Sequence, residues 1–140
     1  MKSMISANFE RNISISRLCD EILASNEHIY FVSSVTKNGR VVESKFRNDG
    51  IISNMSRQEI EMFFMQRTLQ ASLSREFDDL ISPLDFITIQ REILLEFIFP
   101  YSEGNILTVC DLDVIPRYLA KKILFLIRDF DWRLNTKLYA

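Results

Sequence analysis

The chain has 140 residues, of which 47% are hydrophobic and 26% are charged. At this length a single fold buries roughly 68% of the surface that the unfolded chain exposes, so a core can form without disulfides or metals. The 17 basic and 19 acidic residues give a formal charge of −2, which argues against nucleic acid or an anionic membrane as partner. We expect one domain over 1–140, with its core at about 14–130 and terminal extensions at 1–13 and 131–140.

The two cysteines and the N-terminal sequence indicate the cellular compartment. Cys19 and Cys110 lie far apart in apolar stretches, which is typical of buried, reduced thiols. The N-terminus lacks an apolar run long enough for a signal peptide, and no segment approaches the ~20 apolar residues of a membrane span. These features predict a soluble, cytoplasmic protein with no membrane partner.

The first predicted helix and hairpin follow each other closely. Apolar residues at helical spacing after Ser14 predict a helix over 15–25, with Ser14 as its cap. The segments 28–36 and 40–47 then flank Asn38-Gly39, and Asn-Gly is a strong hairpin signal because both central residues of a type I′ turn need positive φ. A two-residue turn would pair Phe31 with Phe46, Ser33 with Ser44, and Val35 with Val42.

A long helix is predicted in the middle of the chain. Ser56 and Glu59 match a capping box, which places the helix start here. Ser82-Pro83 ends the pattern at about residue 81, so the helix would have ~24 residues. Its wide apolar stripe comprises Ile60, Phe63, Phe64, Met65, Leu69, Leu73, Phe77 and Leu80.

Three strands and a last helix complete the predicted order. The strands span 86–90, 93–101 and 106–112, and the middle one is apolar on both faces, so we expect it inside the sheet. Asp113 is the predicted cap of the last helix, with Pro116 in its first turn. Residues 131–140 would form a frayed or docked tail anchored by Trp132.

The resulting order is α-ββ-α-βββ-α, an α+β fold with a five-stranded antiparallel sheet and helices on both faces. This order and these lengths resemble the roadblock/LC7 group of profilin-like folds, in which the first and last helices share one face and the long middle helix covers the other. The segments CDEIL, VTKNGRVV, SRQEIEMFF, SREFDDLISPLDFITIQRE and NILTVCDLD are also similar to uncharacterised small proteins of ammonia-oxidising archaea (Thaumarchaeota). The resemblance covers about residues 14–128 and implies a fold but no catalytic residue.

Residues that could carry catalysis or bind a cofactor are few. The three glycines are isolated, so no phosphate-binding loop can be written, and His28 is the only histidine, which excludes multi-histidine metal sites. Asp111 and Asp113 could hold a hard cation, but a strand end and a helix cap explain them better. We therefore predict no catalytic residue, no cofactor and no metal site, and a protein that is not an enzyme.

The last helix carries a basic stripe, with Arg117, Lys121 and Arg128 on one face and Lys122 beside them. Such a stripe can contact phosphates. Because the chain has a net negative charge, the favoured interpretation is the exposed face of an amphipathic helix.

The middle helix has more apolar residues than one face can hold, and Met-rich surface is common at adaptable interfaces. Cover by residues 48–55 of the same chain is an equally good explanation. Roadblock-type proteins pair through this helix and the following strand, so the resemblance implies a homodimer joined near 60–73 and 84–90. The candidate interface residues are Ile60, Phe63, Phe64, Met65, Arg67 and Phe86.

Two functional hypotheses follow. The first is a non-enzymatic, roadblock-like interaction or regulatory module that acts as a homodimer with an unidentified protein partner. The second is a PAS-like or Cache-like sensor that encloses a small ligand between the sheet and the helices. In the second hypothesis Phe31, Phe46, Phe97 and Phe99 would line the pocket.

Overall fold

The computed structural model describes the backbone of residues 4–139 and the side chains of residues 8–136. The chain order is α-ββ-αα-βββ-α, which differs from the predicted order only by one additional short helix. The elements are α1 (Met4–Ala24), β1 (Ile29–Val35), β2 (Val41–Phe46), α2 (Gly50–Ser53), α3 (Arg57–Arg75), β3 (Ile87–Gln90), β4 (Leu94–Tyr101), β5 (Gly104–Asp111) and α4 (Pro116–Tyr139).

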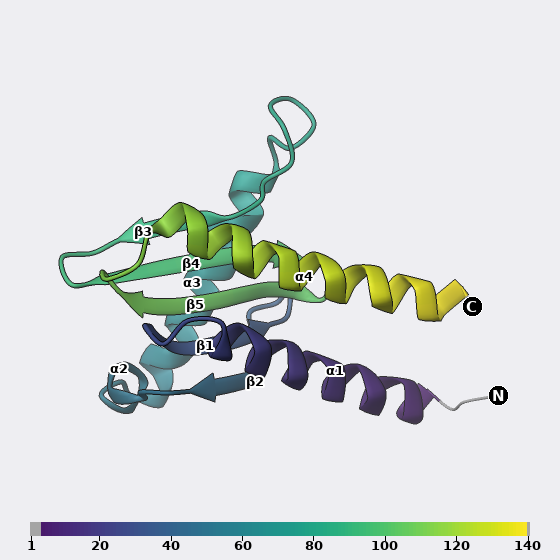
Figure 1. The fold of residues 1–140 in the computed structure, drawn as a ribbon, viewed down its shortest axis with the longest axis horizontal. Helices are drawn as coiled ribbons and strands as arrows, with labels where there is room; N and C mark the ends of the chain where they lie inside the picture. Colours follow the sequence, from purple (N-terminus) through teal and green to yellow (C-terminus); the bar gives the residue numbers. More distant parts are fainter. Residues whose placement is uncertain (1–3, 140) are drawn as a thin grey trace.

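The five strands form one antiparallel sheet in the order β2-β1-β5-β4-β3 (Figure 1). β4 lies between β5 and β3, which confirms the prediction that the apolar strand is interior. β2 and β3 form the two edges. The first hairpin joins the sheet through β1, which pairs with β5 near the end of the chain, so strands far apart in sequence lie side by side.

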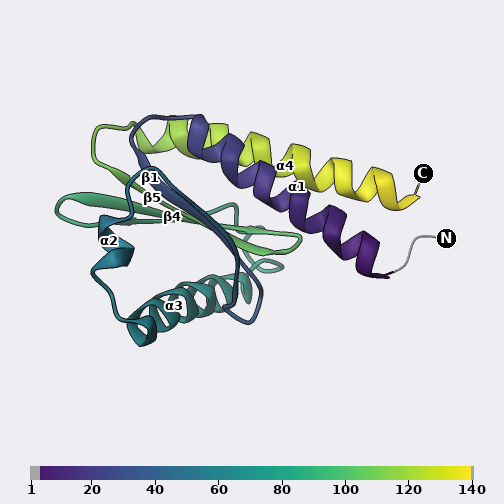
Figure 2. The same ribbon diagram turned by 90° about the horizontal axis from the view of Figure 1, so that it is seen from below.

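Helices cover both faces of the sheet, as predicted. α1 and α4 lie next to each other on one face and α3 covers the other (Figure 2). Beneath α1 and α4 is a continuous apolar core in which the rings of Phe97 and Phe99 stack with centroids 5.9 Å apart. Cys19 and Cys110 are both buried there, as predicted, and burial raises the pKa of each thiol to about 12.

The β1–β2 hairpin forms as predicted, but its turn is different. Gly39 has a φ of 84°, whereas Asn38 does not have positive φ, so the turn is not type I′. The Thr36 carbonyl accepts a hydrogen bond from the Gly39 N–H at 2.9 Å, and the Thr36 N–H donates to the Arg40 carbonyl at 2.8 Å. This three-residue loop is a type I turn followed by a residue in the left-handed region.

The longer turn changes the strand register near its end. Phe31 pairs with Phe46 and Ser33 with Ser44 as predicted, but a bulge after Ser34 pairs Val35 with Val41 in place of Val42. The extra residue in the loop shifts the pairing by one position.

Three predicted helix boundaries are wrong. α1 begins at Met4, because residues 4–14 contain no Gly or Pro to stop the helix, and Ser14 therefore lies inside it. α4 begins at Pro116: the Asp113 N–H donates to Asp111 Oδ1, while the Ile115 carbonyl accepts from the first helical turn. α4 also continues to Tyr139, so Trp132 is an exposed helical residue and does not anchor a tail.

α3 ends at Arg75, six residues before the predicted end. After Arg75 the backbone forms shorter-range bonds, with the Asp78 N–H donating to the Arg75 carbonyl at 3.1 Å. Asp78 Oδ1 accepts from the Leu84 N–H at 3.0 Å, and this side-chain bond offers the backbone an alternative to the helix. Residues 76–86 consequently form a long loop between α3 and β3.

Gly104 allows two hairpins to meet closely. It has a φ of 139°, and a Cβ at this position would overlap the Val35 carbonyl oxygen at the end of β1. Only glycine can satisfy both the backbone angle and this contact. Among the described residues, no helix is both long enough and apolar enough to cross a bilayer.

Candidate functional site

The inner face of α3 is only partly apolar. Phe64, Arg67, Thr68 and Ala71 are buried, and their spacing of three and four residues places them on the side that faces the sheet. Phe64 packs with Val35 and Leu107, and Ile60 and Phe63 complete this small cluster. Two of the four buried positions of α3 are thus polar.

A buried ion pair links α3 to the sheet. Arg67 Nε donates to Glu96 Oε1 at 2.7 Å, and Arg91 Nε donates to Glu96 Oε2 at 2.6 Å. Burial by itself would raise the pKa of Glu96, which is 4% exposed, but the bonds from both guanidinium groups lower it overall. The Arg67 guanidinium also lies 4.8 Å from the centre of the Phe63 ring. Arg67 therefore positions α3 on the sheet.

The outer face of α3 also carries a row of apolar residues. Four long side chains, between 51% and 55% exposed, recur at spacings of three and four residues and form a row that we call the outer stripe: Met62, Met65, Leu69 and Leu73. Phe77, 53% exposed, continues the row just beyond the helix. An amphipathic helix on a soluble monomer normally has polar and charged residues on its outer face. The outer stripe is therefore an apolar surface that nothing in the described chain covers.

The β3 strand next to α3 has an unpaired edge. β3 pairs with β4 on one side only, and it is the outermost strand of the sheet (Figure 1). The backbone N–H and C=O groups on its other side can pair with another strand. The outer stripe and this edge together form the candidate site, which is a surface for association.

The structure turns most of the predicted interface residues inward. Phe64 and Arg67 are buried within one copy, and Ile60 and Phe63 are half-buried beside them. Met65 is on the outer stripe, where it packs against Gly39 of the hairpin turn. Phe86 lies on the opposite face of the sheet, against the aromatic core. Its ring centroid is 6.4 Å from that of Phe97 and 5.7 Å from that of Phe99.

In the sequence, Leu69 and Leu73 belong to the predicted apolar stripe, but neither they nor Met62 were among the candidate interface residues. Helical spacing groups Arg67 and Thr68 with Phe64 and Ala71 and leaves the leucines on the other side, but it does not show which side meets the sheet. The burial of Phe64 also means that Phe64→Glu would destabilise the fold as well as any dimer. A clean test of an interface must use the outer stripe.

One polar cluster lies at the end of the sheet. His28 Nδ1 and Asp111 Oδ2 are 3.0 Å apart, and ligand atoms of His28, Asp111 and Asp113 lie within 4.8 Å of one another. The hydrogen bond that His28 Nδ1 donates to the Asp111 carboxylate raises the pKa of His28. Burial would raise the pKa of Asp111, but its bonds with His28 and the Asp113 backbone lower it. These hydrogen bonds account for the arrangement, in which Asp111 joins the start of β1 to the turn before α4.

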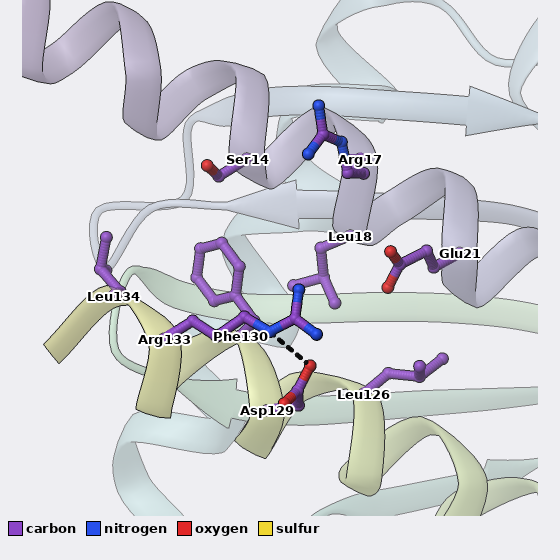
Figure 3. A pocket seen from close by; sticks show the side chains of 9 residues that line it. All are labelled: Ser14, Arg17, Leu18, Glu21, Leu126, Asp129, Phe130, Arg133 and Leu134. Atoms are coloured by element: carbon purple, nitrogen blue, oxygen red, sulfur yellow. Dashed lines mark ion pairs between the residues drawn. The ribbon is translucent and has the colours of Figure 1, made fainter. Parts of the chain in front are cut away.

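A small cavity lies between α1 and α4. It has a volume of about 90 Å³, and Figure 3 shows its mouth, where Arg133 Nε and Asp129 Oδ2 form an ion pair at 3.1 Å. Ligand pockets typically measure about 300–1,000 Å³, so this space suits a few water molecules. The lining residues are Ser14, Arg17, Leu18, Glu21, Leu126, Asp129, Phe130, Arg133 and Leu134.

The four phenylalanines of the sensor hypothesis do not share a pocket. Phe97 and Phe99 are fully buried in the α1/α4 core, where their own rings fill the space between sheet and helices. Phe31 packs against Phe46, with ring centroids 5.7 Å apart, on the α3 face. The sheet separates the two pairs, so this hypothesis gains no support.

The comparisons with known proteins concern the fold. No protein-family model matches the chain, and no curated protein matches it significantly in sequence. MglB of Myxococcus xanthus has a TM-score of 0.67 and 13% identity, over 96% of this chain and 95% of that one. The roadblock/LC7 domain from Streptomyces avermitilis has a TM-score of 0.63 and 9% identity, over 89% and 98%. The gliding protein MglB from Thermus thermophilus has a TM-score of 0.61 and 10% identity, over 95% of each chain. The protein has a roadblock/LC7-like fold.

Proposed function

We propose that the protein is a non-enzymatic, roadblock-like interaction module that acts as a homodimer through the outer stripe of α3 and the free edge of β3. The observation that carries this proposal is the exposed apolar row on the outer face of α3. The helix buries an arginine on its inner face and exposes Met62, Leu69 and Leu73 on its outer face. A contiguous exposed apolar surface of this kind marks an association site.

The geometry favours a symmetric pair. In a two-fold interface the same surface of both copies meets, so each outer stripe would pack against the other and each β3 edge would pair with its equivalent. The sheet would then continue from one copy into the next. The outer stripe of α3 and the free edge of β3 would both be covered in the same contact. A solved MglB structure with this fold is described as having a tetrameric arrangement, which supports self-association.

The proposed cellular role is regulation by protein contact in the cytoplasm. The dimer would present its remaining surfaces to an unidentified protein partner, and the resemblance to archaeal proteins suggests the kind of organism in which to look for it. No side-chain cluster in the described chain supports catalysis better than a structural role, so the proposal includes no reaction.

The test is the solution mass, measured by size-exclusion chromatography with light scattering over about a hundredfold range of concentration. We expect a mass near twice 16.5 kDa for the wild type and near 16.5 kDa for Leu69→Glu. Leu69 is exposed, so the variant should stay folded as a monomer, with an unchanged circular dichroism spectrum and a cooperative thermal transition. Phe9→Glu, at an exposed position on α1, is the matched control and should remain a dimer.

Two results would contradict the proposal. The first is a wild-type protein that stays monomeric at every concentration. The second is a Leu69→Glu variant that dimerises as well as the Phe9→Glu control, because a charge cannot be buried at the centre of an apolar contact without a large loss of affinity.

A further inference from the structure

The outer face of α4 carries a second exposed apolar row. Tyr118, Phe125 and Trp132 are 70%, 72% and 67% exposed. They are spaced by seven residues, about two helical turns, so they lie in one line along the helix. In the part of the chain with described side chains, none of these rings contacts another ring. We call this line the aromatic row, and it belongs to neither the core nor the α3 interface.

Positive charge borders the aromatic row. α4 contains six basic and two acidic residues, although the whole chain has a charge of −2. Arg117 and Lys121 are exposed on this border, while Lys122 Nζ donates to the Ser25 carbonyl and Arg128 Nη2 donates to Asp85 Oδ1. Aromatic rings beside cations form a surface suited to a segment that is both acidic and apolar.

The loop between α3 and β3, residues 76–86, has this complementary chemistry. It contains four acidic residues and no basic one. Asp78 pairs with Arg75, and Asp85 at the base of the loop pairs with Arg128 of α4 in the same copy, which leaves Glu76 and Asp79 for a partner. Leu80 and Ile81 are each 80% exposed. Figure 1 shows the loop projecting from the body of the protein beyond β3. We call this segment the arm.

The arm is held in shape by its own hydrogen bonds. The Leu80 and Ile81 N–H groups both donate to the Phe77 carbonyl, at 3.2 Å and 2.9 Å. The bond from the Leu84 N–H to Asp78 braces its base, as does the ion pair between Arg75 and Asp78. A segment that is already ordered loses less entropy on binding than a free one, so its two aliphatic side chains are presented ready for contact.

We propose that the arm of one copy docks on the aromatic row of α4 of a second copy. The opposite charges attract, and Leu80 and Ile81 supply the apolar surface that Phe125 and Trp132 lack in a single chain. Within one copy the arm tip points away from α4 (Figure 1), so the contact is between molecules. Different surfaces meet, which makes the contact heterologous and lets it link copies into assemblies larger than a dimer.

The first experiment uses a synthetic peptide of residues 75–86 as the probe. Trp132 is the only tryptophan, so its fluorescence reports on the aromatic row without any label. We expect a blue shift on titration, and a loss of affinity of about tenfold or more when salt is raised from about 0.02 M to about 0.5 M. A peptide with Leu80→Ser and Ile81→Ser should bind at least tenfold more weakly, as should the Phe125→Ser protein with the wild-type peptide.

The same titration on Leu69→Glu separates this inference from the proposed α3 dimer, because peptide binding to α4 does not need that dimer. A second experiment measures mass at high concentration. Wild type in low salt should exceed the mass it has in high salt, and Leu80→Ser/Ile81→Ser should not. The inference is overturned if the peptide causes no shift, or if vesicles of anionic lipid shift Trp132 emission and the peptide does not, since the row would then be a lipid contact.

Discussion

The two faces of the sheet are built differently. Under α1 and α4, seventeen buried residues form one continuous apolar core, whereas the cluster that joins α3 to the sheet is smaller and comprises Val35, Phe64 and Leu107. The α3 face compensates with a charged link between Arg67 and Glu96. The ion pair fixes the orientation of α3 on the sheet. The outer stripe is not needed for that attachment, so it can stay exposed.

The comparison also shows how one domain can combine a rigid part with an associating part. The α1/α4 side has the packing that stabilises the monomer. The α3 side keeps enough contacts to hold its position, and it leaves Met62, Leu69 and Leu73 exposed for a second molecule. Stability and association therefore depend on separate residues, which makes both testable by substitution.

The largest effect should come from the larger core. Phe97→Ala should lower the free energy of unfolding by about 4 kcal/mol, because it removes a ring from a site with little room to collapse. Phe64→Ala should cost less, about 3 kcal/mol, because the half-exposed Ile60 and Phe63 can move into the space. Denaturant titration at fixed protein concentration measures both. Equal costs would show that the two faces are not different in packing.

The buried ion pair should show strong coupling. Glu96→Leu leaves the Arg67 guanidinium buried without its carboxylate, and we expect a loss of about 3 kcal/mol. The double variant Arg67→Met/Glu96→Leu should recover most of it, since two apolar side chains replace the pair without an unpaired charge. A double-mutant cycle on urea midpoints gives the coupling energy. Additive losses would mean that the pair does not act as a unit.

The same pair predicts acid sensitivity of the α3 face. The folded-state pKa of Glu96 lies below the ordinary value of 4.5, so its contribution to stability is present above about pH 4.5 and is lost as the pH falls through the folded-state pKa. Unfolding free energies from about pH 6 down to about pH 3 should therefore fall further for the wild type than for Arg67→Met/Glu96→Leu. Parallel curves would argue against an ionised Glu96 in the folded protein.

The cap of α3 should have a smaller effect. Ser56→Ala removes one half of a capping box in which the Ser56 hydroxyl accepts from the Glu59 N–H at 3.1 Å. We expect a loss of about 1 kcal/mol, measured by thermal unfolding. Ser53→Ala, at an exposed position in α2, is the control and should change little. A cost as large as that of Phe64→Ala would mean that the cap, and not the cluster, holds α3.

The smallest effect concerns the half-buried pair His28–Asp111, which contrasts with the fully buried pair Arg67–Glu96. The bond to Asp111 raises the pKa of His28 above 6.5, so its contribution to stability is present below pH 6.5 and is lost as the pH rises through the folded-state pKa. Proton NMR of the only histidine should show this raised pKa, and Asp111→Asn should lower it towards 6.5. An unchanged His28 titration in Asp111→Asn would contradict the hydrogen bond.

The sequence located the helix that carries the candidate site, but it did not show which side chains of that helix are exposed. The excess of apolar residues over 60–73 predicted an interface on the middle helix, and the structure buries two of the residues named for it, Phe64 and Arg67, within one copy. Helical spacing defines which residues share a face, and it does not define which face meets the sheet when both are apolar. The Arg67 ion pair decides this, and its partner Glu96 lies on a distant strand.

The local signals in the sequence were sufficient for the element order, the hairpin, the capping box and the interior position of β4, because turns, caps and apolar periodicity act over a few residues. Tertiary structure alone decided the rest. The bulge after Ser34, the end of α3 at Arg75 and the exposure of Trp132 depend on contacts or on solvent that the local pattern does not encode. The face that α3 turns towards the sheet also depends on tertiary contacts. Arg67 can be buried only because Glu96, on a distant strand, pairs with its charge.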